Sequence, residues 1–350
     1  METQARRRAK EHIMSWGSGG ARPAGVPTGS VATIVLADRA HLAALTASGL
    51  VGPGTLVFAP GSADGDEAAQ VVGYEGSLAE PGADFALGED FYLQTQDYAS
   101  SAYMSVLGPT LVRVFGTEDF AAFCADADRA FAQGVFPEFL ITPSVVIADL
   151  AALGAAGQED GPGLRLYVGP DGSVSTSPGG TPLGTVGETP EVLATRFEHV
   201  NAASEVPCAV SLGAVVPEEA RTAALQVRPF LARYLAAVRA LRTLTAQDIG
   251  GLKVSGFGAR LTPGLSAAGH ESDLLDAGLP LVLFTPDQAY AVHSGRVFTI
   301  GHTTARALEA LLAAQDAAED FAAPAVLDRV RTFFADRGIR LDARIPAGVR

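Results

Sequence analysis

Side chains that could carry chemistry are few and far apart in this 350-residue sequence. The six histidines are scattered, and no two of them stand at a spacing diagnostic of a metal site. The densest polar cluster, His270-Glu271-Ser272-Asp273, lies in a Gly- and Ala-bounded loop and is more typical of a solvated turn. Lys253 is the one plausible Schiff-base nucleophile, but its apolar neighbours predict a short strand with the lysine facing solvent.

Short catalytic motifs are missing as well. There is no Gly-Lys pair for a phosphate-binding P-loop, no GxSxG nucleophile elbow and no HExxH zinc motif. Gly256-Phe257-Gly258 is too short to cradle a pyrophosphate. We therefore predict no catalytic residue, no bound metal and no cofactor, and we favour a chain that is not an independent catalyst.

Composition narrows the classes of partner and the compartment. The net charge of −14 repels phosphate backbones and anionic lipids, which predicts neither a nucleic-acid nor a membrane partner. Cys124 and Cys208 are isolated thiols, as is usual in a reducing cytoplasm. The basic cluster Arg6-Arg7-Arg8 is not followed by the apolar stretch of a signal peptide, and no window is apolar over the ~18 residues of a membrane span. We predict a cytoplasmic protein.

Gly- and Pro-rich stretches along the chain suggest four consecutive segments. Gly17 to Ser30 is mostly Gly, Pro, Ser and Ala, which predicts flexibility, and Met14 is an alternative start. An amphipathic helix is predicted over 217–244, broken at Pro229. The predicted organisation is a flexible segment (1–30), an α/β domain (31–155), an α+β domain containing the long helix (156–275) and a C-terminal element (276–342).

The C-terminal element carries the clearest pattern. Three apolar runs, 279–284, 289–292 and 296–300, are joined by short turns and predict a three-stranded antiparallel sheet. A Leu-rich helix is predicted over 305–313 with Thr303 as its cap, and a second helix over 324–336 begins with a proline. Three small strands followed by two helices predict a winged helix.

This order of elements resembles the recognition element of ribosomally synthesised and post-translationally modified peptide (RiPP) pathways, the PqqD-like winged helix. The resemblance covers less than a fifth of the chain. The whole chain looks like the recognition protein of daptide-type pathways in actinobacteria. The resemblance implies a non-catalytic adaptor that binds the precursor's leader peptide by β-strand addition and presents it to a modifying enzyme, an alcohol-dehydrogenase-like oxidoreductase or an aminotransferase.

The same resemblance implies which residues hold the peptide. The leader would lie along the third strand of the sheet, in a groove facing the last helix. Phe298 and Val330 are the two that we expect to be buried outright. The peptide-binding residues expected on the strand are Val297, Phe298, Thr299 and Ile300, and those on the helix are Val326, Arg329, Val330, Phe333 and Phe334.

Two other functions stay open at this point. The first is a peptide-modifying enzyme that carries its own recognition element, with residues 31–275 as an unfamiliar catalytic domain. The second is a winged-helix transcriptional regulator, or a winged helix used only for dimerisation. A regulator needs a positive last helix, and Arg329, Arg331 and Arg337 are there partly countered by Asp328 and Asp336.

Overall fold

The computed structural model describes residues 4–62, 70–156, 160–204, 209–267, 269 and 271–343. The chain divides into two compact units. The N-terminal unit consists of Met1–Phe123 and Ser144–Gln226, and the C-terminal unit of Cys124–Pro143 and Val227–Arg350. Both units combine segments that lie apart in the sequence. Gly- and Pro-rich runs mark loops, but they do not show which elements pack together. The second, third and fourth predicted segments (31–155, 156–275 and 276–342) stay predictions.

The prediction of a flexible segment over 1–30 is wrong for residues 4–18. These residues form helix α1 (Gln4–Ser18), which buries Ile13 and Trp16 completely. The Trp16 indole Nε1 donates a hydrogen bond to the Leu166 carbonyl oxygen at 2.8 Å. Ala9, Ile13 and Trp16 follow one another at helical spacing, and this apolar stripe outweighs the Gly- and Pro-rich stretch behind it.

A ten-stranded mixed sheet organises the N-terminal unit, in the order β10-β9-β8-β1-β2-β3-β4-β5-β6-β7. The strands are β1 (Thr33–Leu36), β2 (Leu56–Pro60), β3 (Val71–Gly76), β4 (Asp84–Ala86), β5 (Tyr92–Asp97), β6 (Thr110–Arg113), β7 (Val145–Ile147), β8 (Arg165–Val168), β9 (Ser173–Ser175) and β10 (Gly184–Thr185). Its other elements are η1 (Arg39–His41), α2 (Leu42–Ala47), α3 (Tyr98–Ser101), α6 (Pro190–Ala203), η2 (Ala209–Leu212) and α7 (Glu218–Gln226), while α4 (Thr117–Gln133) runs from this unit into the next.

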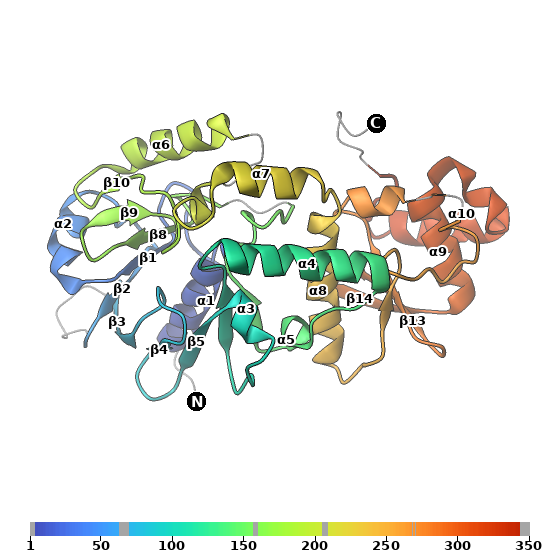
Figure 1. Ribbon diagram of the computed structural model, residues 1–350, viewed down its shortest axis with the longest axis horizontal. Helices are drawn as coiled ribbons and strands as arrows, with labels where there is room; N and C mark the ends of the chain where they lie inside the picture. Colours follow the sequence, from blue (N-terminus) through green and yellow to red (C-terminus); the bar gives the residue numbers. More distant parts are fainter. Residues whose placement is uncertain are drawn as a thin grey trace. The chain divides into compact units, whose positions relative to one another are not determined.

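The two faces of this sheet are covered by different helices. Alternate residues of a strand point to opposite faces, so β2 contributes Leu56 and Phe58 to the core around α1. Val57 and Ala59 contribute to the other core, which contains residues of α2 and α6. Figure 1 shows α1 and α6 as separate layers beside the strands of this unit. Burial on both faces explains why the β1 and β2 sequences are continuous apolar runs.

A buried histidine on α1 makes the stability of the N-terminal unit depend on pH. His12 is fully buried, its Nδ1 lies 2.9 Å from Thr33 Oγ1, and its Nε2 has no hydrogen-bond partner among the described residues. Burial, and next the positive charge of Arg8, lower the pKa of His12 to about 4. Between pH 6.5 and 4 the unfolded chain therefore binds a proton that the folded chain does not, so stability falls as the pH falls through this window.

We expect the unfolding free energy of the variant His12→Gln to lack this dependence on pH. Relative to the variant, the wild type should lose roughly 2 kcal/mol of unfolding free energy between pH 7 and pH 5. Urea titrations of both proteins at the two pH values measure the difference. Equal pH dependence of the two proteins would contradict a buried, neutral His12.

The C-terminal unit combines a small sheet with helices. Its elements are α5 (Glu138–Ile141), α8 (Leu231–Thr245), β11 (Lys253–Val254), η3 (Ser272–Leu275), β12 (Leu281–Phe284), β13 (Ala289–His293), β14 (Arg296–Ile300), α9 (His302–Ala314), η4 (Gln315–Asp320) and α10 (Pro324–Ala335). The predicted break of the long helix at Pro229 is confirmed, since α7 ends at Gln226 and α8 begins at Leu231. Within the described ranges, no helix is both long and apolar enough to cross a lipid bilayer.

The predicted antiparallel meander is confirmed, with one strand more than expected. The order is β11-β12-β13-β14, and the added strand β11 carries Lys253, which is exposed as predicted. Apolar residues of β12 and β13 form one core with α9 and α10, which includes Ala291, Leu308 and Leu327. The fold class is therefore mixed α/β with a separate antiparallel sheet and helices at the C-terminus, and Figure 1 draws that sheet and its helices in orange and red.

Candidate peptide-binding site

The strand expected to receive a peptide lies at an edge of its sheet. β14 pairs with β13 on one side, from His293↔Arg296 to Ala289↔Ile300. In the part of the chain that the structure describes, no strand pairs with its other side. The hairpin turn consists of Ser294 and Gly295, both at positive φ (48° and 76°), as in a tight two-residue turn of type I′.

This turn decides which backbone groups face outward. In a two-residue hairpin the flanking pair, here His293 and Arg296, exchanges both ladder hydrogen bonds, and the following pairs alternate. Arg296, Phe298 and Ile300 therefore bond inward to β13. The N–H and C=O groups of Val297 and Thr299 point to the open edge, where an extended peptide could pair with them.

Helix α10 faces this strand through aromatic rings. The Phe298 ring centroid lies 5.9 Å from that of Phe333 and 6.1 Å from that of Phe334, both in edge-to-face geometry. Phe334 is fully buried, whereas Phe298 and Phe333 are half-buried and pack against the rim of the core. Strand and helix thus share an apolar surface that the protein covers only in part.

The nine residues predicted to bind the peptide divide by burial. Val330 and Phe334 are 2% and 0% exposed and belong to the core. The expectation of a buried residue holds for Val330 but is wrong for Phe298, because an edge strand is covered from one side only. Thr299 and Arg329 are exposed, and the half-buried residues are Val297, Phe298, Ile300, Val326 and Phe333. The role of these residues in peptide binding stays a prediction.

Two arginines that are not among the nine predicted peptide-binding residues contact the rings of Phe298 and Phe333. The Arg337 guanidinium lies 3.7 Å from the Phe333 ring centroid and donates a hydrogen bond to the Phe333 carbonyl oxygen at 2.8 Å. The Arg296 guanidinium lies 5.2 Å from the Phe298 ring centroid. The spacing of Phe333 and Arg337, four residues apart on a helix, was the signal that could have revealed the first contact.

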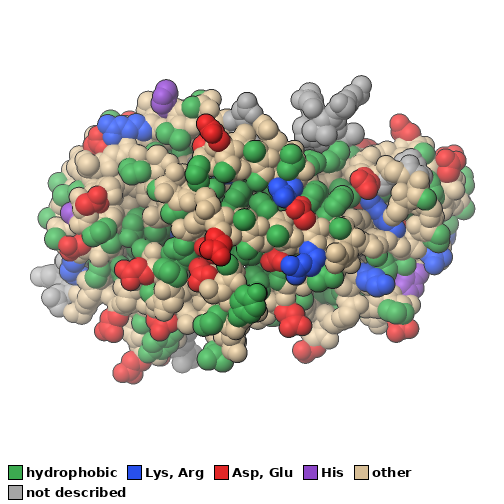
Figure 2. Space-filling view, in the orientation of Figure 1, with side chains coloured by type: hydrophobic (Ala, Val, Ile, Leu, Met, Phe, Trp, Pro, Cys, Tyr) green, Lys and Arg blue, Asp and Glu red, His purple; other side chains and the backbone are tan. Residues whose placement is uncertain are grey.

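Several arginines influence the hairpin residue His293. Burial lowers the pKa of His293 most, and the positive charges of Arg296, Arg233 and Arg340 lower it further. Arg296 on β14, Arg329 on α10 and Arg337 after α10 are all exposed. Figure 2 shows Asp and Glu side chains dispersed over the visible face without a single acidic patch. Asp328 on α10 and Asp336 directly after it are exposed as well.

The other candidate polar and nucleophilic residues are placed only in part by the described structure. The cluster predicted as a solvated turn includes His270, which lies outside the described residues, as does Cys208. Among the residues with described positions, no group of three His, Cys, Asp or Glu side chains could hold a metal ion. Cys124 is buried, and burial raises the pKa of its thiol, which opposes formation of the nucleophilic thiolate.

Comparison with known proteins gives no independent indication of function, since no protein-family model, curated protein or solved structure matches the chain.

Proposed function

We propose that the protein is a RiPP adaptor that captures a precursor's leader peptide on β14 and presents the peptide to a modifying enzyme, an oxidoreductase of the alcohol-dehydrogenase type or an aminotransferase. In this proposal β12–β14, α9 and α10 act as a PqqD-like winged helix. One observation carries it: the edge of β14 has no described strand beside it and adjoins the half-buried rings of Phe298 and Phe333.

The geometry defines how a peptide would bind. An added strand would exchange main-chain hydrogen bonds with Val297 and Thr299, which gives affinity without regard to sequence. Its alternate side chains would face α10, so two apolar residues at positions i and i+2 would contact Phe298, Phe333 and Val326. An acidic residue beside them would meet Arg329 or Arg337, whose charges are exposed at the rim.

Proline at Thr299 tests the strand addition. Thr299 directs its N–H outward, so proline removes one bond to the peptide without removing a bond to β13. We expect Thr299→Pro to weaken binding of the fluorescein-labelled candidate leader peptide about tenfold, as the loss of one main-chain hydrogen bond implies. Thr299→Val keeps the N–H and the β-branched shape and is the matched control. Fluorescence anisotropy measures both affinities.

Two further variants test the groove itself. Phe333→Ala removes a half-buried ring, and Arg337→Gln removes the charge that lies on it. Both should weaken binding, and the Arg337 effect should shrink at high salt. Val330→Asp is unsuitable because Val330 is in the core and an aspartate there would unfold the unit. The same affinity for Thr299→Pro and Thr299→Val, with both proteins folded by circular dichroism, would refute strand addition.

A further inference from the structure

The loop between α3 and β6, residues 102–109, exposes large apolar side chains. Tyr103 is 91% and Leu107 93% exposed, and Met104 between them is more than half exposed. Tyr103 and Leu107 are four residues apart, so at most ~14 Å of chain separates them. A connecting loop needs only small or polar residues at such positions. Their clustering therefore indicates a surface that another molecule covers.

Tyr92 extends this surface from the neighbouring strand. It is the first residue of β5 and is also more than half exposed. Two residues further along β5, the Gln94 N–H donates a hydrogen bond to the Pro109 carbonyl oxygen at 3.0 Å, so Tyr92 and the end of the loop are within roughly 10 Å. Four of the seven large hydrophobic residues that are exposed in the described part of the chain thus lie in this region. We call Tyr92, Tyr103, Met104 and Leu107 the apolar patch.

Hydrogen bonds hold the loop at both ends. At its start, the Asp97 side chain caps α3 by accepting a hydrogen bond from the Ser100 N–H at 2.8 Å. The Tyr103 N–H donates to the Ser100 carbonyl oxygen at 2.9 Å. At its end, Thr110 Oγ1 donates to the Gly108 carbonyl oxygen at 3.0 Å. A loop fixed in this way loses less conformational entropy on binding than a free one, which favours its use in an interface.

The segment that carries the patch has acidic exposed charges only. The exposed charged residues within 84–118 are Asp84, Glu89, Asp90 and Glu118. Arg113, the one basic residue of this stretch, is buried. Asp84 lies opposite Gln94 in the sheet, and Gln94 lies opposite Thr110. Asp84 is therefore two strand spacings, or ~10 Å, from the end of the loop, a distance over which its charge acts at low salt.

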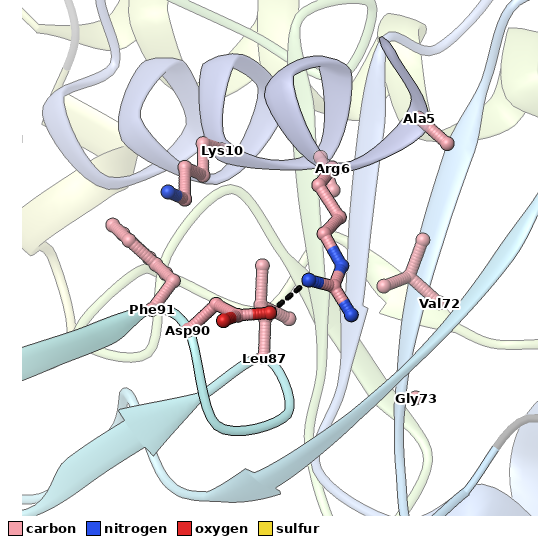
Figure 3. Close-up of a pocket in the computed structure, with 9 residues that line it drawn as sticks. Ala5, Arg6, Lys10, Val72, Gly73, Leu87, Asp90 and Phe91 are labelled. Atoms are coloured by element: carbon pink, nitrogen blue, oxygen red, sulfur yellow. Dashed lines mark hydrogen bonds and ion pairs between the residues drawn. The ribbon is translucent and has the colours of Figure 1, made fainter. Parts of the chain in front are cut away.

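Asp84 and Tyr92 point to the same face of the sheet. Phe85 and Leu93 belong to the core under α1. Their neighbours Asp84 and Tyr92 therefore point away from that helix. The cations of α1, such as Arg6 in Figure 3, belong to the helix side of the sheet. The face with the patch presents a carboxylate, which a Lys or Arg of a partner complements, whereas a second copy of this chain, with its net charge of −14, and an anionic lipid surface are repelled.

We infer that the apolar patch docks the modifying enzyme, through a pocket on the enzyme whose centre is apolar and whose rim is basic. The inference rests on the adaptor proposed above and adds where the enzyme binds. Tyr103 and Leu107 enter the pocket, and Asp84 faces a Lys or Arg on its rim. The patch belongs to the N-terminal unit and β14 to the C-terminal unit, so the enzyme and the leader peptide bind different surfaces of one chain.

The probes are the oxidoreductase and the aminotransferase encoded beside the precursor gene. Each is purified and titrated against the full chain by isothermal titration calorimetry. We expect one of them to bind the wild type with a dissociation constant of roughly 1–10 µM. The double variant Tyr103→Ser/Leu107→Ser should weaken binding about a hundredfold, because it removes the two most exposed apolar side chains of the patch. Asp84→Lys should weaken binding about fivefold at low salt and less at high salt.

Val227→Ser is the matched control. It removes an exposed apolar side chain of the other unit and should leave the affinity unchanged. The inference is overturned if neither enzyme binds, if the double variant binds as tightly as the wild type, or if Val227→Ser weakens binding as much. It is also overturned if the patch instead causes dimerisation in sedimentation velocity, or binding to phosphatidylcholine vesicles, that the double variant loses. Circular dichroism shows that each variant is folded.

Leader-peptide anisotropy on the same proteins separates this inference from the function that it rests on. The double variant should bind the leader peptide as the wild type does, because the patch and β14 belong to different units. Leader binding without binding of either enzyme overturns the docking surface and leaves peptide capture standing. Enzyme binding that depends on the patch, without leader binding, supports the docking surface and refutes peptide capture.

Discussion

Replacing Arg165 by Met is expected to lower the unfolding free energy of the N-terminal unit by about 4 kcal/mol or more, the upper range for breaking a buried ion pair. Arg165 is fully buried at the start of β8 and binds two carboxylates. Its Nη1 lies 2.8 Å from Asp149 Oδ1, while its Nε and Nη2 donate to both oxygens of Asp160 at 2.8 and 2.7 Å.

The expected loss is large because the substitution leaves Asp160 without its cation and Asp149 with Arg113 alone. Burial tends to raise the pKa of Asp160, but the charge and hydrogen bonds of Arg165 overcome it and keep this pKa below its usual value. Arg113, itself buried, remains beside Asp149 at 3.1 Å and cannot reach both acids in their present positions. The buried charge of Asp160 would then keep only the hydrogen bonds from Ser211 Oγ and the Gly161 N–H among its described partners.

Trp16 allows the unfolding of the N-terminal unit to be followed by its fluorescence. It is the only tryptophan of the sequence, and its carbonyl oxygen accepts a hydrogen bond from Arg165 at 2.9 Å. Its fluorescence during urea unfolding therefore reports on the N-terminal unit. Arg196→Met is the matched control, because Arg196 pairs with Glu188 at a surface where both are partly exposed, and its loss should cost less than about 1 kcal/mol. A similar, small loss for both variants would show that the buried network contributes no net stability.

This network has a bearing on the enzyme alternative. Asp149, Asp160, Arg113 and Arg165 form one network of ion pairs in the N-terminal unit, yet each side chain is at most 2% exposed. Because these side chains are buried, a substrate could contact them only if the surrounding helices and strands unfolded. We therefore assign these charges a structural role, which links β6 and β8 to the loop after β7.

Local patterns predicted the elements well, and their long-range pairing poorly. The apolar runs 31–36 and 55–59 are typical of buried strands and overlap β1 and β2, and Pro170-Asp171-Gly172 is typical of a tight turn and lies between β8 and β9. No local pattern indicates that β8 pairs with β1, which lies more than a hundred residues earlier. Helix α1 was missed because its apolar stripe includes Ala9 and His12, two residues that carry no clear hydrophobic signal. His12 is buried only because the sheet covers it.

The candidate site was predictable in outline for a similar reason. The order of strands and helices is local, so the meander and α10 were found with accurate limits. Which side of α10 faces β14 depends on the tertiary packing. Val330, Phe333 and Phe334 fall on one apolar stripe, and only the structure separates the half-buried Phe333 from the two core residues.

The second large effect concerns Glu309 on α9, which holds the loop after β11 in the core. Its carboxylate is 1% exposed and accepts hydrogen bonds from the backbone N–H groups of Leu261 at 2.8 Å and Thr262 at 2.5 Å. Ser255 Oγ donates a third at 2.5 Å. Glu309→Ala leaves these buried donors without an acceptor, and we expect a loss of roughly 3 kcal/mol from the C-terminal unit.

Hydrogen exchange followed by mass spectrometry is the suitable measurement, since Trp16 lies in the other unit. Protection should fall in residues 253–262 and in α9, and more weakly in Glu309→Gln, whose amide oxygen still accepts hydrogen bonds. Glu319→Ala, an exposed position of η4, is the control and should change nothing. If Glu309→Ala keeps full protection, β11 and its loop are not part of the unit that supports β14, and the smaller segment 276–342 suffices. If protection falls, the protein truncated to 276–342 is expected to bind the leader peptide less tightly than the whole chain. The truncated protein lacks β11 and the groups that donate hydrogen bonds to Glu309.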